Sequence, residues 1–464
     1  MLGLFSTLDL ARRAMQTQMA GVETTGQNIA NVNTPGYSRQ RVDITTSPDM
    51  PSGFGTEGTG SQVVGIQRIV SDLLNGQIQS NTSGLGYQQS RQTALQGAQD
   101  ALGEFLSSGN GTSSSGLSSQ LSSLFSAFQS VAATPNSVSA RQALIGAAQS
   151  LATMFNQVGK QFTDLKTSLN TSLNNDVDSA NKLLSSIADL NKQISGMEAS
   201  GGNANDLRDK RELALENLSK LTDISTSTDN LGQINVSIGG QSLVSGRQVA
   251  DTLKTYDAGG GQLLVQTATG GTNLTLTSGS MQGTIDARDN ELGGMQTKLD
   301  SLASNLISAV NTVHSGGYSP TGTTGANFFN GTDAATISVN QSLVNNPSLI
   351  QTSSSAAGTS DNSVALQLAQ LASTAQTGLN SQTFGDFYGA AVTGLGSALN
   401  DANTQVSNQQ AVSDMLATQR GSVSGVNLDE EMTNMLTFQR AYTASAELLK
   451  TVDQMIQTTL GMKT

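Results

Sequence analysis

Residues 155–197 read FNQVGKQFTDLKTSLNTSLNNDVDSANKLLSSIADLNKQISGM, and this stretch decides the fold of the chain. Apolar residues recur in it at spacings of three and four, as on one face of an α-helix. They are Phe155, Val158, Phe162, Leu165, Leu169, Leu173, Val177, Ala180, Leu184, Ile187, Leu190, Ile194 and Met197. At about 1.5 Å per residue the pattern predicts a helix on the order of 60 Å long. Such a helix needs neighbours that cover its apolar face.

Helical patterns also lie on both sides of this stretch. They cover residues 70–106, 117–132, 205–221, 283–314, 363–377 and 383–420. A Gly/Ser-rich break from Ser107 to Gly116 separates the first two. We therefore expect a bundle of long helices that contains residues 53–223 and 283–420, with a small loop and strand region at 315–362. Phe328 and Phe329, inside that region, are predicted to anchor it to the core.

Between two of these helical patterns the period changes to two. Residues 234–238 alternate apolar and polar side chains, and Gly239-Gly240 then offers a hairpin turn. Residues 263–265 and 274–276 are further strand candidates. Residues 224–282 are thus predicted to form a small β domain inserted between helices.

Both ends of the chain carry amphipathic helices. In residues 4–31 the apolar stripe consists of Leu4, Leu8, Ala11, Met15, Val22 and Ile29. The last helix is predicted to start at Asn427, with a stripe of Leu428, Met432, Met435, Tyr442, Leu449, Ile456 and Leu460 and with Phe438 and Val452 beside it. Two helices with apolar stripes of matched length can bury these stripes against each other, whereas one helix alone leaves its stripe exposed. Residues 1–52 and 421–464 are therefore expected to form a paired terminal domain.

Two short motifs mark the boundaries of these end helices. Asn28-Ile29-Ala30-Asn31-Val32-Asn33-Thr34-Pro35-Gly36-Tyr37 reads as a helix end followed by a turn, because Asn31 tolerates left-handed angles, Pro35 fixes its own φ and Gly36 accepts a positive φ. In Ser424-Gly425-Val426-Asn427-Leu428-Asp429-Glu430-Glu431-Met432, Asn427 is predicted to cap the last helix, with Glu430 as the reciprocal member of a capping box. Residues 38–70 read as extended.

The composition excludes several classes of function. The 464 residues carry a formal net charge of −12, so nucleic acid and anionic membrane surfaces are disfavoured as partners. No stretch is apolar enough for membrane insertion, and we expect no signal peptide, because polar and charged residues interrupt the apolar positions of residues 1–30. There is no cysteine and only one histidine, His314. These counts argue against a catalytic triad, a metal site or a bound cofactor, so we expect none of them and no enzyme activity. His314 itself is expected to be a surface or satisfied core residue.

The end motifs resemble those of the bacterial flagellar axial proteins. The segment from Asn28 to Tyr37 is similar to the signature shared by rod, hook and hook-associated proteins. The segment from Ser424 to Met432, continued by Phe438-Gln439-Arg440-Ala441-Tyr442, is most similar to the first hook-associated proteins, the family of hook–filament junction subunits. The stretches 206–211, 280–283 and 310–314 also carry that family's pattern.

The resemblance implies a structural subunit that leaves the cell through type III export and assembles as a ring between hook and filament, hence a secreted, extracellular protein of the flagellum. It implies like subunits, the hook protein and hook-associated protein 3 as partners, and an export chaperone at the C-terminal region. The terminal helices and the turn at Asn31, Thr34, Pro35, Gly36 and Tyr37 are then the assembly interface.

Two alternatives stay open at this point. The first is another axial subunit, a hook or distal-rod protein, although the long helix at 155–197 argues against it because hook subunits are mostly β outside their termini. The second is a secreted adhesin or hydrolase that uses flagellar export. This second alternative needs a polar cluster or a ligand pocket in the middle of the chain, and the sequence offers none.

Overall fold

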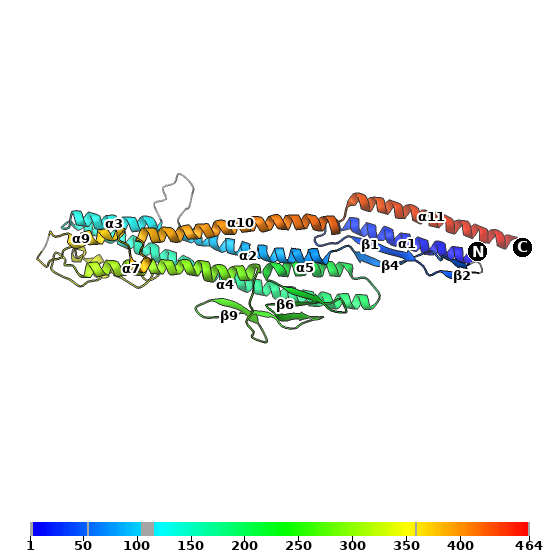
Figure 1. Cartoon of the computed structure of the whole chain (residues 1–464), viewed down its shortest axis with the longest axis horizontal. Helices are drawn as coiled ribbons and strands as arrows, with labels where there is room; N and C mark the ends of the chain where they lie inside the picture. Colours follow the sequence, from blue (N-terminus) through cyan, green and yellow to red (C-terminus); the bar gives the residue numbers. More distant parts are fainter. Residues whose placement is uncertain (1–2, 53–54, 104–115, 358–359, 463–464) are drawn as a thin grey trace.

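The chain forms a long, narrow molecule of helices that run along its length (Figure 1). The computed structural model describes residues 3–52, 55–103, 116–357 and 360–462. The expected Gly/Ser break lies outside the described residues, except for Gly116. The expected fold class, mainly α with inserted β structure, is confirmed.

The longest helix is α4 (Val138–Ala199), with 62 residues and a length of about 93 Å. It begins well before residue 155, where the predicted helix starts, because the same spacing continues upstream through the buried Leu144, Ala148 and Leu151. Ser137 caps its first turn by accepting a hydrogen bond from Ala140 N. The predicted helix is therefore confirmed, but its predicted start lies too late in the chain.

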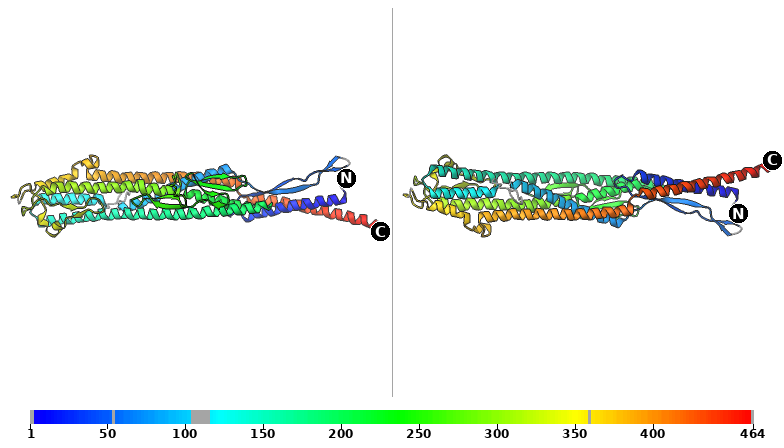
Figure 2. Two further views of the ribbon diagram at one scale, coloured as in Figure 1. Left: turned by 90° about the horizontal axis from the view of Figure 1, so that it is seen from below. Right: turned by 90° about the horizontal axis from the view of Figure 1, so that it is seen from above.

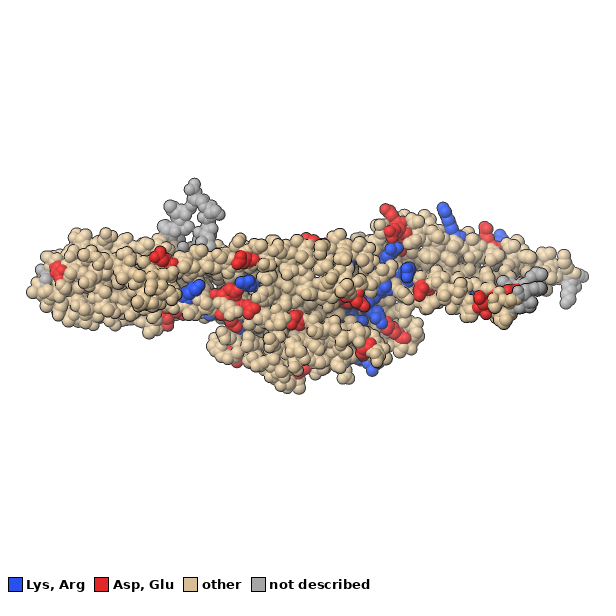
Figure 3. Space-filling model, in the orientation of Figure 1, with Lys and Arg blue, Asp and Glu red and all other residues tan. Residues whose placement is uncertain are grey.

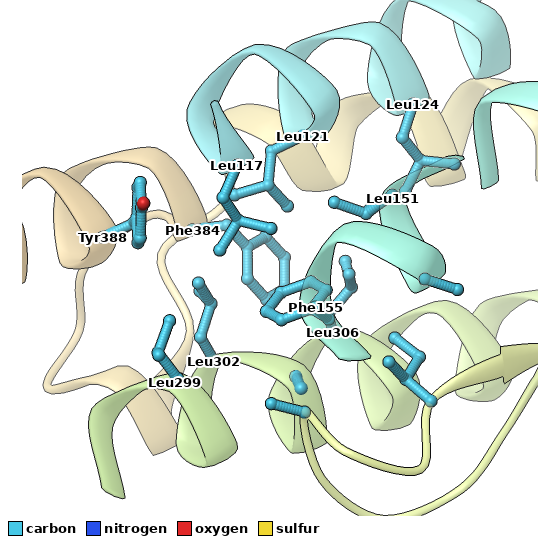
Figure 4. Close-up of a cluster of buried hydrophobic side chains, with 14 of the residues drawn as sticks. Leu117, Leu121, Leu124, Leu151, Phe155, Leu299, Leu302, Leu306, Phe384 and Tyr388 are labelled. Carbon is cyan, nitrogen blue, oxygen red and sulfur yellow. The ribbon is translucent and has the colours of Figure 1, made fainter. Parts of the chain in front are cut away.

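The other helices of the bundle contact α4 directly or pack on helices that do. They are α2 (Asp72–Leu102), α3 (Leu117–Ala133), α5 (Asn205–Leu221), α6 (Gly279–Asp286), α7 (Gly293–Ser315), α9 (Ser363–Gln370) and α10 (Phe384–Ser424). A π-helical segment, Ala287–Leu292, joins α6 to α7, so the helix expected at 283–314 has two parts. The main core lies between α3, α4, α7 and α10, where Leu117, Phe155, Leu302 and Phe384 meet (Figure 4).

The inserted β structure lies on one side of α4 and α5. Strands β5 (Ser225–Thr228), β6 (Ile234–Ile238), β7 (Gln241–Ser245) and β8 (Gln248–Val249) form an antiparallel sheet in chain order, and β9 (Leu253–Asp257) pairs with β10 (Leu263–Thr267). Gly239 and Gly240 both have positive φ and make the predicted hairpin turn. Residues 274–276 were wrongly predicted as a strand. They follow the isolated bridge between Asn273 and Gln266, and backbone pairing with β10 ends where Leu274 N donates to Val265 O. Leu276 then packs into the core beside the sheet.

Short elements close the end of the bundle that lies far from the termini. They are β11 (Phe329–Asn330), β12 (Ser338–Val339), α8 (Gln341–Asn345) and the 3-10 turns Pro347–Leu349, Leu371–Ser373 and Thr377–Leu379. Phe328 and Phe329 are fully buried, and the ring centroids of Phe128 and Phe328 lie 5.3 Å apart. The predicted anchoring role of this pair is confirmed.

The other end is a slender extension that we call the terminal arm, and the rest of the chain is the body (Figures 1 and 2). The arm consists of α1 (Leu4–Ala30), α11 (Leu428–Gly461) and a two-stranded ribbon of β1 (Gln40–Thr46) and β4 (Ser61–Arg68). Strands β2 (Met50–Ser52) and β3 (Gly55–Glu57) continue the ribbon outward. The domain boundary expected at residue 52 therefore falls inside the ribbon, because residues 55–68 pair back onto residues 40–52.

Candidate assembly site at the terminal arm

Helices α1 and α11 lie side by side along the arm (Figure 1). Of the predicted stripe residues, Ala11 and Val452 are fully buried. Those that are half-buried are Leu4, Leu8, Met15, Val22, Ile29, Met435, Phe438, Tyr442, Leu449 and Ile456. Leu428, Met432 and Leu460 are exposed. The two helices thus meet as expected, but the single chain leaves much of their apolar surface only partly covered.

The closest approach of the two helices depends on a glycine. A Cβ atom at Gly21 would lie 2.6 Å from the Phe438 ring, far inside van der Waals contact. The other buried residues of α1 are Ala11, Thr17, Thr24, Thr25 and Asn28, which are small or polar. The tightest part of the arm is therefore built from small side chains that let backbones approach.

The predicted turn after α1 is present. Tyr37 N donates to Thr34 O at 3.1 Å, and Gly36 has a φ of 77°. Asn31 is half-buried and its side chain accepts from Thr34 Oγ1, whereas Thr34, Pro35 and Gly36 are exposed. The turn directs the chain into the ribbon.

Asn28 is the centre of a hydrogen-bond network at the base of the arm. Its fully buried amide donates to Gln40 O at 2.8 Å and to Glu431 Oε2 at 2.9 Å. Its carbonyl oxygen accepts from Tyr37 Oη and from Gln40 N, each at 2.9 Å. One side chain of α1 thereby connects the turn, the ribbon and α11.

Glu431 of α11 is buried within the same network. Its carboxylate pairs with Arg39, with 2.8 Å between Arg39 Nε and Glu431 Oε1. Asn427 caps α11 as predicted, because its side chain accepts from Asp429 N and Glu430 N. The capping box is not closed by Glu430, whose carboxylate instead lies 3.1 Å from Arg39. The acidic residues at the start of α11 therefore bind the segment that leads into the ribbon, in addition to stabilising the first turn of their own helix.

Helix α5 of the body completes the network. Asp209 accepts from Ser38 N at 2.9 Å and from Arg68 at 2.6 Å, and Asp206 accepts from Gln40 Nε2 at 2.9 Å. Burial raises the pKa of Tyr37, and the carboxylates of Asp206, Asp209 and Glu431 raise it further, so its phenol stays a donor. Charged residues gather at this joint, and a second group of charged residues lies farther along the body (Figure 3).

The sequence analysis missed several residues of this site. Gly21, Asn28, Arg39 and Glu431 were outside the predicted interface, although Asn28 and Glu431 lie within the quoted motifs. A polar Asn within a helical stretch and an acidic residue next to a cap were available signals. Their partners lie up to 403 residues away in the chain, as Asn28 and Glu431 show, so only the tertiary structure could pair them.

The body contains the single histidine of the chain. Among the residues that the structure describes, no group of three His, Cys, Asp or Glu could hold a metal ion. His314 is fully buried; its Nδ1 bonds Ala326 O at 2.8 Å, and its Nε2 accepts from Gln351 N at 3.0 Å. It is a satisfied core residue. No helix in the described part of the chain is apolar enough to cross a membrane.

Comparisons with protein families match three parts of the chain. The helical domain of the flagellar hook-associated protein FlgK matches residues 106–329. The flagellar basal body rod FlgEFG protein C-terminal family matches residues 419–462, and the flagella basal body rod protein family matches residues 8–37. The two rod-protein matches coincide with α11 and with α1 and its turn.

Relatives match over nearly the whole chain. Flagellar hook-associated protein 1 of Bacillus subtilis is 30% identical, and the match covers 98% of each chain. The protein of the same name from Escherichia coli is 25% identical, with 99% of this chain and 100% of that one covered. The solved structure of the flagellar hook junction protein FlgK from Burkholderia pseudomallei superposes with a TM-score of 0.64 at 18% identity, over 75% of this chain and 100% of that one.

The paired ends and the helical body define a structural subunit of the bacterial flagellar axis. Within that class, the chain belongs to the flagellar hook-associated protein 1 family. The expectation of a structural flagellar subunit of the hook–filament junction is confirmed at the level of this family. The protein is accordingly part of the exported flagellum.

Proposed function

We propose that this chain forms a ring of like subunits between hook and filament, and that neighbouring copies join through their terminal arms. The observation that carries the proposal is the large apolar surface that α11 leaves uncovered. Its exposed apolar side chains are Leu428, Met432, Leu436, Leu448, Met455 and Leu460, and Met462 directly after the helix is exposed as well. Apolar patches of this kind, bordered by polar residues, mark interaction sites on soluble proteins.

The location of the hydrophobic core supports the proposal that the arm, and not the body, joins neighbouring copies. The two large clusters of buried apolar side chains lie in the body, between residues 94 and 402 and between residues 173 and 285. In α11 only Glu431 and Val452 are buried. A helix that buries so little within its own chain gains stability by packing against other copies. We infer that the arm becomes fully ordered only in the assembled ring.

The body is then the outer layer of the ring, with the arms inside it. We relate these layers to the three domains expected from the sequence, with the ribbon counted as part of the arm. The expected domains are 1–52 with 421–464, 53–223 with 283–420, and 224–282. The hook protein and hook-associated protein 3 are the proposed neighbours on either side of the ring. An export chaperone would cover the C-terminal region before type III export and keep its apolar side chains from aggregating. Assembly needs no catalysis, cofactor or metal.

Deleting the gene and imaging the cells tests this proposal. We expect hooks without filaments and flagellin lost to the medium, and restoration of filaments by the full-length gene. Cells without hooks would support a hook or distal-rod subunit instead. Normal filaments would refute both functions.

A further inference from the structure

A groove opens on one side of the arm, between α1, α11 and the base of the ribbon. It has a volume of about 370 Å³. Gly21, which has no side chain, forms part of its floor, and Val42, Ile69 and Phe438 supply apolar walls. The groove can therefore receive an apolar side chain from outside the molecule.

The polar rim of the groove contains one unpaired cation. Arg39 and Glu431 line the groove but neutralise each other in the ion pair described above. Arg41, also on the rim, is exposed, and its guanidinium forms no ion pair or hydrogen bond with the residues that the structure describes. A ligand for this groove should thus combine an apolar group with a nearby carboxylate.

The outer flank of α11 presents such a combination. Leu428, Met432 and Leu436 follow one another at spacings of four and are 44%, 56% and 54% exposed. Asp429 lies beside them, exposed, and its carboxylate makes no ion pair within the described ranges. We call these four residues the α11 ridge.

The ridge and the groove lie on different flanks of the same arm. Because successive residues of an α-helix are rotated by about 100°, the ridge lies roughly 130° around α11 from Glu431, Asn434 and Phe438, which line the groove. One copy therefore cannot fill its own groove with its own ridge. A head-to-tail contact uses both surfaces on every copy and, repeated around an axis, generates a ring or a helical array.

We infer that the groove of each copy receives the α11 ridge of the next copy, with Arg41 paired to the neighbour's Asp429. This inference rests on the proposed ring. The groove supplies the apolar pocket and the cation, and the ridge supplies the apolar side chains and the anion. The charge pair fixes the register of neighbouring copies, while burial of the ridge drives the association.

Cross-linking in assembled flagella tests the contact directly. The chain has no cysteine, so introduced cysteines report only the chosen positions. Cells that make two variants together, Arg41→Cys in one copy and Met432→Cys in another, should give cross-linked dimers of this chain with a short thiol-specific reagent. The matched control replaces Met432→Cys by Met455→Cys, since Met455 is 53% exposed on another side of the same helix. It should give at least about ten-fold less dimer.

Charge reversal is an independent test. Arg41→Asp and Asp429→Arg should each lower the number of subunits assembled per hook at least about ten-fold, because each brings like charges together. The double variant should restore assembly. Arg41→Asp should keep the helicity and melting temperature of the parent, since Arg41 has no ion-pair partner within the described chain. Asp429→Arg also loses the favourable interaction of an acid with the first turn of α11, so the restoration of assembly in the double variant is what separates the contact from a weakened helix.

The outcomes separate this inference from the proposed function. Filament loss on gene deletion, combined with normal assembly of both single charge variants or with equal cross-linking at positions 432 and 455, would overturn the contact and leave the ring intact. A cross-link from position 41 to a different flagellar protein would also overturn it. Normal filaments in the deletion strain would remove the ring itself.

Discussion

Single residues with short side chains hold the arm together. Asn28 satisfies four polar groups from the turn, the ribbon and α11, and Gly21 makes room for Phe438. Neither residue stands out in a hydrophobic pattern. Their importance comes from geometry, because a buried polar group without a partner and an overlapping pair of carbon atoms are both costly.

Asn28→Ala should destabilise the arm by about 3 kcal/mol, because it leaves Gln40 and Glu431 with unpaired buried polar atoms. Amide hydrogen exchange in α1 and the ribbon measures the change, and exchange in α4 should stay the same. Asn31→Ala is the control, since Asn31 is half-buried and bonds only within its own turn. Equal effects of the two substitutions would contradict the central role of Asn28.

Gly21→Ala should weaken the pairing of α1 and α11 by about 1–3 kcal/mol, because the added methyl overlaps the Phe438 ring. Exchange protection along α11 measures this loss. Gly76→Ala is the matched control in α2, where nothing lies within 4 Å of the added carbon. It should stabilise its helix by up to about 1 kcal/mol. Unchanged protection of α11 in the Gly21 variant would refute the predicted overlap.

His314 should make the body less stable in mild acid. Burial lowers its pKa to about 4, from an ordinary value of 6.5, and Nε2 is occupied as an acceptor from Gln351 N. Between these two pKa values the unfolded chain binds a proton that the folded chain does not. The free energy of unfolding therefore falls as the pH drops from about 6.5 towards 4, by at most about 3 kcal/mol.

Urea titrations at pH 7 and pH 5 measure this effect. The His314→Gln variant should lose much less stability over that interval than the parent, because Gln does not titrate. An identical loss in both proteins would assign the acid sensitivity to other groups.

At the scale of elements, α11 and the body differ in what stabilises them. The body helices bury continuous apolar faces in two large cores, so they fold within one chain. Helix α11 has a matching partner in α1 but buries little, and its acidic start is engaged with the ribbon. The stability of the arm therefore depends on partners that the body does not need.

Removing residues 428–464 should leave the body folded. The main thermal transition should shift by less than about 2 °C, because no residue of α11 belongs to either large core. Hydrogen exchange in α1 should rise strongly, since α1 loses the helix that covers it. The truncated protein should also fail to enter the ring. A large fall in melting temperature would show that the arm supports the body.

At the scale of the whole molecule, the joint at α5 sets the direction of the arm. Asp209 links the ribbon to the body through Ser38 and Arg68, and Asp206 adds a second connection to Gln40. Charged residues gather at this joint, whereas the end of the body farthest from the arm shows few on its visible face (Figure 3). These bonds limit the angles at which the base of the arm can meet the body.

Asp209→Asn should broaden the distribution of angles between arm and body. Spin labels at Thr443→Cys and Ser185→Cys, both exposed positions of a cysteine-free chain, report the distance between the two parts. The width of the distance distribution should increase, since the charged acceptor for Arg68 is lost. Asp223→Asn is the control, because Asp223 bonds Thr277 within the body. A similar width in both variants would refute the role of Asp209.

The sequence by itself determined the elements that depend on nearby residues. Periodic apolar positions predicted the long helix and both end helices, Gly36 and the Gly239-Gly240 pair predicted their turns, and Asn427 predicted its cap. These features follow from local backbone geometry and from the spacing of apolar side chains, which a single segment contains.

Only the tertiary structure decided which distant segments meet. It paired residues 40–52 with residues 55–68 in a ribbon, paired Glu431 with Arg39 instead of leaving it as a simple helix start, and brought Asp209 to Ser38. It also left Leu428 and Met432 exposed, where the sequence shows only a continuous stripe. Local spacing specifies how wide an apolar face is, but which part of it is covered depends on where the rest of the chain packs.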